Sequence, residues 1–208
     1  MTGTNRTARA FRLIHGGAAA NEPPALTAFA PGQGWPAELN GVPFAPWRDH
    51  PTPDGWDDAG LTNPTLTEPP LAAPAEARVA AAAVVLEKDH RLWALAPASS
   101  YDSRTACLPA GAQAAALSLQ AVAVRECWER TGLKVRIIGW LGDFDDGVLQ
   151  HTRYYLAERL GGAPASCAWA QDRVLLATLD ALSRPAPFGM SLADRRCLVA
   201  LRNVLAIG

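Results

Sequence analysis

The sequence predicts an α/β layered domain over residues 78–208, preceded by an extended N-terminal arm over residues 1–77 that is rich in proline and tryptophan. After residue 78, apolar runs of strand length alternate with stretches of helix length, which is typical of helices packed on a sheet. Twelve of the 17 prolines, in contrast, precede Arg78. Because proline interrupts helices and central strands, regular structure is not expected in the arm.

The arm also carries large aromatic side chains, which a solvated linker rarely does. The segment 39–47 has a turn signal followed by aromatic residues between prolines, which suits an extended strap lying over a folded surface. Docking onto its own domain is the simplest interpretation, and a lid over a substrate pocket or a dimer contact are the alternatives. The aromatic residues are Phe29, Trp35, Phe44, Trp47 and Trp56.

The domain begins with two apolar runs separated by the charged turn 87–90, which predicts two buried strands joined by a short connection. Three further strands and two helices follow. Ser118 and Ser191 are plausible N-caps, and Gly132 and Gly208 plausible stops. The expected strands are 79–86, 91–96, 133–141, 152–160 and 173–177, and the expected helices 118–130 and 191–205.

Composition excludes several classes of partner. The formal net charge is −1, from 19 basic and 20 acidic residues, so no global field attracts nucleic acid or an anionic membrane. No apolar run approaches the roughly 18–20 residues of a membrane span. The four cysteines show no CxxC spacing, so reduced thiols in a cytoplasmic protein are expected. A basic start with Arg6, Arg9 and Arg12 is interpreted as a frayed terminus rather than a transit peptide.

Helix 118–130 carries the residues that point to chemistry. At 3.6 residues per turn, Glu126, Glu129 and Arg130 share one face. Two carboxylates three residues apart on a rigid helix can jointly hold a hard divalent cation such as Mg²⁺. Arg125 is four residues from Glu129 and can pair with it. The opposite face predicts a core stripe: Leu117, Ala121, Val124 and Trp128.

The segment 111–133 resembles the Nudix box. That pattern is a Gly, five residues, a Glu, seven residues, Arg-Glu, an apolar residue, any residue, Glu-Glu, any residue, Gly and an apolar residue. The positions in register here are Gly111, Arg125, Glu126, Cys127, Glu129, Gly132 and Leu133.

The resemblance implies a Nudix-like α/β/α sandwich with a mixed β-sheet. It also implies a hydrolase that cleaves the diphosphate linkage of a nucleoside diphosphate joined to another moiety. Glu126 and Glu129 would hold Mg²⁺, with Mn²⁺ as a second candidate, and Arg125 would orient a carboxylate. Gly111 and Gly132 would form structural loops at the ends of the helix. A small nucleotide-type substrate and a possible homodimer follow from the same resemblance.

Two departures from the pattern bear on activity. Leu117 replaces the first Glu, and Arg130 replaces the second Glu of the pair. A guanidinium pointing into the site would lower metal affinity, because it changes the local charge by two units. Alternatively, Arg130 would bind substrate phosphate, as arginine does well. A catalytically impaired nucleotide-binding or protein-interaction module is therefore the alternative to the hydrolase, and a purely structural role is a third hypothesis.

Residues outside the box are further candidates for the site. Arg153 is predicted to bind substrate, together with His151 and Tyr154 as possible contacts to phosphate or base. Trp93 and Trp140 are candidates for stacking on a base. An Asp-rich segment expected to be a loop, and the strand after it, offer additional metal ligands: Asp143, Asp145, Asp146 and Glu158.

Overall fold

The computed structural model describes residues 23–29, 34–97, 106–114, 116–164, 172–184 and 190–207. Its main sheet has the strand order β6-β4-β8-β7. β4 and β8 run parallel, whereas β6 pairs antiparallel with β4 and β7 antiparallel with β8. The sheet is therefore mixed, as predicted. Its strands are β4 (Arg78–Val85), β6 (Ala110–Ala112), β7 (Leu133–Asp145) and β8 (Gln150–Gly162).

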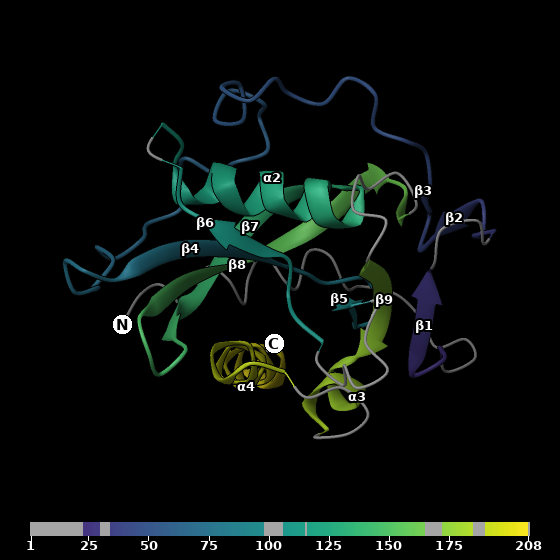
Figure 1. Ribbon diagram of the computed structural model, residues 1–208. Coiled ribbons are helices and arrows are strands. Elements are labelled where there is room, and N and C mark those ends of the chain that lie inside the picture. The colour runs from purple at the N-terminus through teal and green to yellow at the C-terminus, as the bar shows by residue number, and fades with distance from the viewer. Residues whose placement is uncertain are drawn as a thin grey trace.

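Helices cover both faces of this sheet. Helix α2 (Leu119–Thr131) lies on one face and helix α4 (Leu192–Ile207) on the other, which confirms the predicted α/β/α sandwich (Figure 1). Alternate residues of β8 face opposite layers, so Tyr155 joins the core beneath α2 and Tyr154 the core beneath α4. A short helix that was not predicted, α3 (Leu179–Ser183), precedes α4. No helix among the described residues is long and apolar enough to cross a membrane.

The ends of α2 are fixed as the sequence predicts. The Ser118 hydroxyl accepts a hydrogen bond from the backbone N–H of Ala121, and Gly132 ends the helix at a φ of 73°. A Cβ placed at Gly162 would lie 2.3 Å from the carbonyl oxygen of Gly132. Glycine at position 162 therefore lets the end of β8 approach the end of α2. Ser191 also acts as predicted, since its hydroxyl accepts from the Asp194 N–H at 3.0 Å, whereas Gly208 lies outside the described residues.

The first two predicted strands belong to different sheets. β5 (Arg91–Pro97) pairs with β9 (Asp172–Thr178), and a single bridge between Leu86 and Leu92 links it to the end of β4. The reason is that β4 already has β6 on one side and β8 on the other, so β5 must find another partner. Both strands are buried, as expected.

The expectation that the arm lacks regular structure is wrong for three short segments. β1 (Leu26–Phe29) adds antiparallel to β9, and β2 (Glu38–Leu39) pairs with β3 (Val42–Pro43). Asn40 and Gly41 have φ values of 54° and 79°, which suit the tight turn of a hairpin. Backbone pairing to an available edge and a strong turn thus outweigh the high proline content.

The rest of the described arm packs on the domain through its aromatic residues. Trp47 and Trp56 are buried, and their rings lie 6.1 and 5.6 Å from the ring of Trp128 on α2. His50 stacks on the same ring at 3.9 Å. Trp128 therefore contacts the arm and is only partly buried. The other three residues of the predicted core stripe, Leu117, Ala121 and Val124, are buried in the core. Leu61 is also buried, and its carbonyl accepts from the Ile137 N–H on β7 at 2.9 Å.

Candidate active site on helix α2

The polar face of α2 meets the short edge strand β6. A Cβ placed at Gly111 would lie 2.0 Å from Cδ of Glu126, so the Glu126 carboxylate fills the space that a larger residue would occupy. Gly111 was predicted to lie in a loop, but it lies within β6 because it pairs with Ala81. The glycine therefore provides the surface on which Glu126 rests.

Arg125 connects the two carboxylates of the predicted pair. Its Nη2 donates to Oε1 of Glu126 at 2.7 Å, and its Nε forms a longer ion pair of 3.9 Å with Oε1 of Glu129. The Nε group is buried and makes no hydrogen bond within the described part of the chain. Arg125 thus orients Glu126 firmly and Glu129 only loosely.

The two carboxylates also act on each other. Partial burial raises the pKa of Glu129, repulsion from Glu126 raises it further, and attraction to Arg125 opposes both effects. Glu129 is the more accessible of the two, with its side chain 40% exposed against 15% for Glu126. The helix therefore presents a pair of interacting negative charges at a partly open surface.

Arg130 points toward β6. Its Nη1 donates to the carbonyl oxygen of Ala110 at 3.2 Å, and its Nη2 lies 3.8 Å from Sγ of Cys107. Ala110 precedes Gly111, on which Glu126 rests, so the guanidinium and the Glu126 carboxylate lie against neighbouring residues of one strand. The substitution in the box thus brings a fixed positive charge to the edge of the site.

The carboxylate of Asp194, which was not predicted to belong to the site, approaches Arg130 from the α4 side of the sheet. Asp194 in α4 is buried and accepts a hydrogen bond from the Tyr154 hydroxyl at 2.8 Å. Burial raises the pKa of Asp194, and attraction to Arg130 is among the effects that oppose this shift. In the sequence, Asp194 has the form of an ordinary acidic residue in the first turn of a helix. Only the packing of α4 reveals its position.

The carboxylate pair fits a hard divalent cation with few protein ligands. Among the described residues, no group of three or more His, Cys, Asp or Glu side chains is placed to hold a metal ion. Mg²⁺ keeps several waters and is commonly held by one or two carboxylates plus substrate phosphates. A cation would also relieve the repulsion that raises the pKa of Glu129. The donor set therefore suits Mg²⁺ or Mn²⁺ and does not form a closed protein cage.

The additional ligands considered from the sequence are engaged elsewhere. Asp143 and Asp145 lie in β7 and not in a loop, because this strand pairs with β8 up to Asp145 and His151. Asp145 pairs with Arg196 at 2.9 Å, and Asp146 accepts from backbone N–H groups of its own turn. Glu158 pairs with Arg136. The structure groups none of them with Glu126 and Glu129.

The aromatic candidates likewise have structural partners. Trp93 is fully buried and donates to Glu87 at 2.7 Å. Trp140 lies 3.4 Å from Oδ1 of Asp143 through its indole nitrogen. Tyr154 is buried beneath α4. Stacking of a base on either tryptophan, and contact of Tyr154 with phosphate or base, are therefore not supported by their placement.

Arg153 lies in a buried ion network on the α2 face of the sheet. Its Nε and Nη2 donate to the two oxygens of Asp143, each at 2.7 Å, and its Nη1 donates to Oε2 of Glu68 in the arm at 3.0 Å. The hydrogen bonds to Asp143, together with the negative charges of Asp143 and Glu68, raise the pKa of Arg153 above its usual range. The predicted contact between Arg153 and substrate therefore requires the arm carboxylate to give way.

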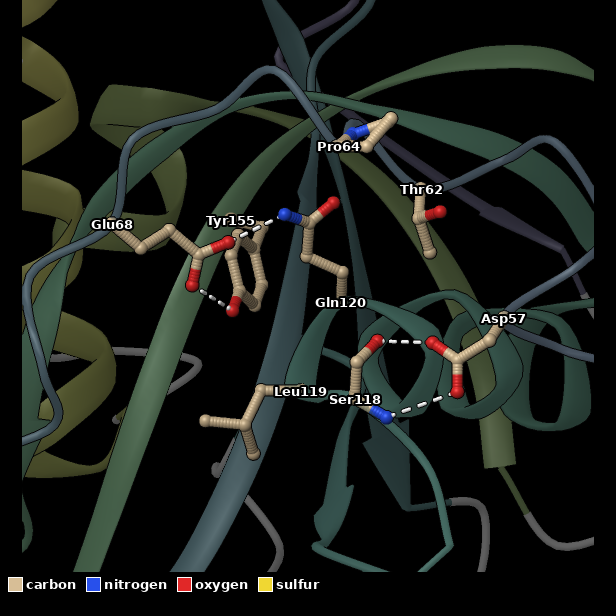
Figure 2. Close-up of a pocket in the computed structure, with 8 residues that line it drawn as sticks. All are labelled: Asp57, Thr62, Pro64, Glu68, Ser118, Leu119, Gln120 and Tyr155. Carbon is tan, nitrogen blue, oxygen red and sulfur yellow. Dashed lines mark hydrogen bonds between the residues drawn. The ribbon is translucent and has the colours of Figure 1, made fainter.

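A pocket of about 340 Å³ lies between the arm and the first turn of α2. Asp57 of the arm accepts hydrogen bonds from both the backbone N–H and the hydroxyl of Ser118, as Figure 2 shows. Glu68 closes the other end by accepting from Gln120 and Tyr155. The pocket is thus bounded by two arm carboxylates. Its lining comprises Asp57, Thr62, Pro64, Glu68, Ser118, Leu119, Gln120 and Tyr155.

Solved structures share this architecture. A Nudix hydrolase from Nitrosomonas europaea has a TM-score of 0.54 and 15% identity, over 61% of this chain and 89% of that one. The E. coli ORF135 protein has a TM-score of 0.51 and 14% identity, over 64% of this chain and 93% of that one. A UDP-X diphosphatase has a TM-score of 0.51 and 20% identity, covering 66% of each chain.

Comparisons by sequence give no match. No model of a known protein family matches the chain, and no curated protein does. The structural likeness, at identities of 14–20%, is one of fold. The chain therefore has a Nudix-like α/β/α fold.

Proposed function

We propose that this chain is a hydrolase that cleaves the diphosphate linkage of a nucleoside diphosphate joined to another moiety, and that Glu126 and Glu129 hold a Mg²⁺ ion. The observation that carries the proposal is the Glu126 carboxylate, which is seated on Gly111 and fixed by Arg125 at 2.7 Å. Gly111 and Arg125 together fix the position of this carboxylate. Such fixing is expected of a metal ligand, whereas a solvated surface carboxylate is usually free to move.

The kind of reaction is supported by the proteins that share the fold. Three of them are described as a Nudix hydrolase, the ORF135 protein and a UDP-X diphosphatase. A bound Mg²⁺ would polarise phosphate oxygens and lower the pKa of a coordinated water. Both effects favour attack of water on a diphosphate.

The protein's own residues would provide the remaining functions. Glu129 is the more exposed of the two carboxylates, so it would hold the cation where water and substrate can reach it. Arg130, held by the Ala110 carbonyl, would bind a phosphate oxygen of the substrate. Arg125 would keep Glu126 in the orientation that the cation needs.

The test is product release from a panel of nucleoside diphosphate compounds, with Mg²⁺ and with EDTA. Wild-type protein is expected to turn over at least one compound only with Mg²⁺. Glu129→Gln removes one of the two proposed ligands of the cation and should reduce kcat at least about 10- to 100-fold, the loss usual even for residues that only support a metal ligand. Glu158→Gln, which changes a strand carboxylate paired with Arg136, is the matched control and should leave turnover unchanged. Equal turnover in EDTA would contradict the proposal.

A catalytically impaired module that binds a nucleotide or a protein is the second candidate. The observation that favours it is Arg130, whose positive charge stands where the Nudix pattern has a carboxylate. This function predicts nucleotide binding that does not depend on Mg²⁺ and no turnover of any compound in the panel. The same assay, combined with a binding titration in EDTA, therefore separates the two candidates.

A further inference from the structure

Three hydrogen-bond donors of the folded domain converge on one carboxylate of the arm. Gln120 at the start of α2, and Arg153 and Tyr155 on β8, all donate to Glu68. We call these three donors the anion seat. The Tyr155 hydroxyl donates at 2.7 Å and Arg153 Nη1 at 3.0 Å. Figure 2 shows the Glu68 side chain reaching toward Gln120 and Tyr155 from the arm.

The anion seat belongs to the domain and is rigidly built. Tyr155 is fully buried, and Arg153 and Gln120 are 4% and 9% exposed. Asp143 holds the guanidinium of Arg153 through two hydrogen bonds, so its Nη1 has a fixed direction. Burial raises the pKa of Tyr155, and Glu68 raises it further, so the hydroxyl stays protonated and able to donate.

Opening the strap removes a charged partner from the anion seat. The three donors are buried with the strap in place, so water can replace Glu68 when the strap opens, but water does not replace the negative charge beside the Arg153 guanidinium. An anionic ligand would restore a charge-assisted hydrogen bond to Arg153. A phosphate group does so, because arginine, hydroxyl and amide donors are typical phosphate ligands.

The segment of the arm that carries Glu68 is attached to the domain without strand pairing. We call residues 62–77 the strap. It follows the buried anchor Leu61, ends where β4 begins at Arg78, and contains no helix or strand. Its described backbone-to-backbone hydrogen bonds, Leu66 to Asn63 and Ala77 to Pro74, are internal. The strap is therefore held to the domain by side-chain hydrogen bonds at Gln120, Arg153 and Tyr155 and by the partly buried Leu66, and not by strand pairing.

We propose that Gln120, Arg153 and Tyr155 form a phosphate-binding site that the strap closes with Glu68 as an internal substitute for the ligand. Binding of a phosphate-type anion and seating of Glu68 then exclude each other. The apparent affinity for the anion is reduced in proportion to the small fraction of molecules in which the strap is open. This inference stands apart from the proposed hydrolysis, because it needs neither a metal ion nor turnover.

The experiment is a calorimetric titration of the full chain with inorganic pyrophosphate in EDTA, so that no cation at the Glu126–Glu129 pair contributes. Glu68→Ala is expected to bind pyrophosphate at least tenfold more tightly than wild type. Adding Tyr155→Phe to Glu68→Ala removes one donor and should reverse most of the gain. Glu76→Ala, which removes an exposed carboxylate of the strap outside the anion seat, should bind as wild type does. The same tenfold gain must persist in a Glu126→Gln background, which distinguishes this site from the proposed active site.

Hydrogen exchange on the wild-type protein gives a second measurement that needs no variant. Saturating pyrophosphate should speed amide exchange in residues 62–77 as the strap opens, while β4 and β8 remain protected. Unchanged or slower exchange in the strap would overturn the proposal. So would Glu68→Ala protein that is folded but binds no more tightly than wild type, or an equal gain in Glu76→Ala.

Discussion

At the scale of single residues, the site consists of four neighbouring charged side chains that attract or repel one another: Arg125, Glu126, Glu129 and Arg130. Glu126 is fixed by Gly111 and Arg125, whereas Glu129 is more exposed and is repelled by Glu126. Arg130 brings a positive charge to the same strand through the Ala110 carbonyl. The balance between these charges decides whether a cation binds, and it can be tested one residue at a time.

The raised pKa of Glu129 predicts that its charge weakens the fold when no cation is bound. An acid whose folded-state pKa is raised contributes stability below its unfolded pKa and loses it as pH rises through the folded pKa. Glu129→Gln should therefore raise the unfolding free energy at pH 7 in EDTA. Urea denaturation of both proteins at pH 7 and near pH 3.5 measures this. The advantage of the variant should disappear at the lower pH, and an advantage that is equal at both would refute the argument.

Replacing the positive charge at position 130 should strengthen cation binding. Arg130→Glu removes a like charge and adds a carboxylate, so the affinity for Mn²⁺ should rise at least tenfold, a difference of about 1.4 kcal/mol. Affinity for the diphosphate substrate should fall, because the proposed phosphate contact is lost. Arg48→Glu makes the same charge change at an exposed position of the arm and should alter neither. Weaker Mn²⁺ binding in Arg130→Glu would show that the guanidinium supports the site.

At the scale of elements, the site is a contact between α2 and β6. The sequence predicts the helix and both of its caps, because Ser118 and Gly132 carry local signals that need no tertiary contact. It does not predict that Gly111 lies in a strand, because β6 exists only through its pairing with β4. Asp194 was equally hidden, because its partner Tyr154 lies on β8. The ion network of Arg153 could not be predicted either, because its partners come from β7 and the arm.

The close approach of β6 to α2 predicts the effect of a single methyl group. In Gly111→Ala the new Cβ overlaps the Glu126 carboxylate, which must move away. Mn²⁺ affinity should fall at least tenfold, while the unfolding free energy falls by no more than about 1–3 kcal/mol, as is usual for one added methyl group. Gly161→Ala is the control, because its Cβ would meet no atom within 4 Å. Calorimetric Mn²⁺ titration and urea denaturation of both variants give the two quantities, and unchanged Mn²⁺ binding in Gly111→Ala would contradict the role given to Gly111.

At the scale of the whole molecule, the arm is integrated with the domain. Proline content suggested an arm without regular structure, yet β1 extends the second sheet and Trp56 and Leu61 are buried in the main core. Composition gives only the average tendency of a segment to form regular structure. Whether one strand pairs or one tryptophan becomes buried depends on the free sheet edges and apolar surfaces that the domain offers. The layered fold of residues 78–208 could be predicted from periodicity, since each strand and helix is a run of consecutive residues with its own apolar spacing.

The buried arm predicts a large loss of stability from a residue far from α2 in sequence. Trp56 is 2% exposed, and Trp56→Ala should lower the unfolding free energy by about 3–5 kcal/mol, as is usual for a buried tryptophan. Trp35→Ala, at a half-buried position of the arm, should cost less. Urea denaturation of both variants compares them. Equal, small losses would show that the arm contributes little to the folded core.

The proposed function depends first on whether Glu126 and Glu129 form one cation site despite Arg130. Electron paramagnetic resonance of Mn²⁺ titrated into the folded protein measures this. We expect one bound ion per chain, with affinity lowered at least tenfold by either Glu126→Gln or Glu129→Gln and unchanged by Glu158→Gln. No bound Mn²⁺ in folded wild-type protein, or binding that both active-site variants retain, would contradict it.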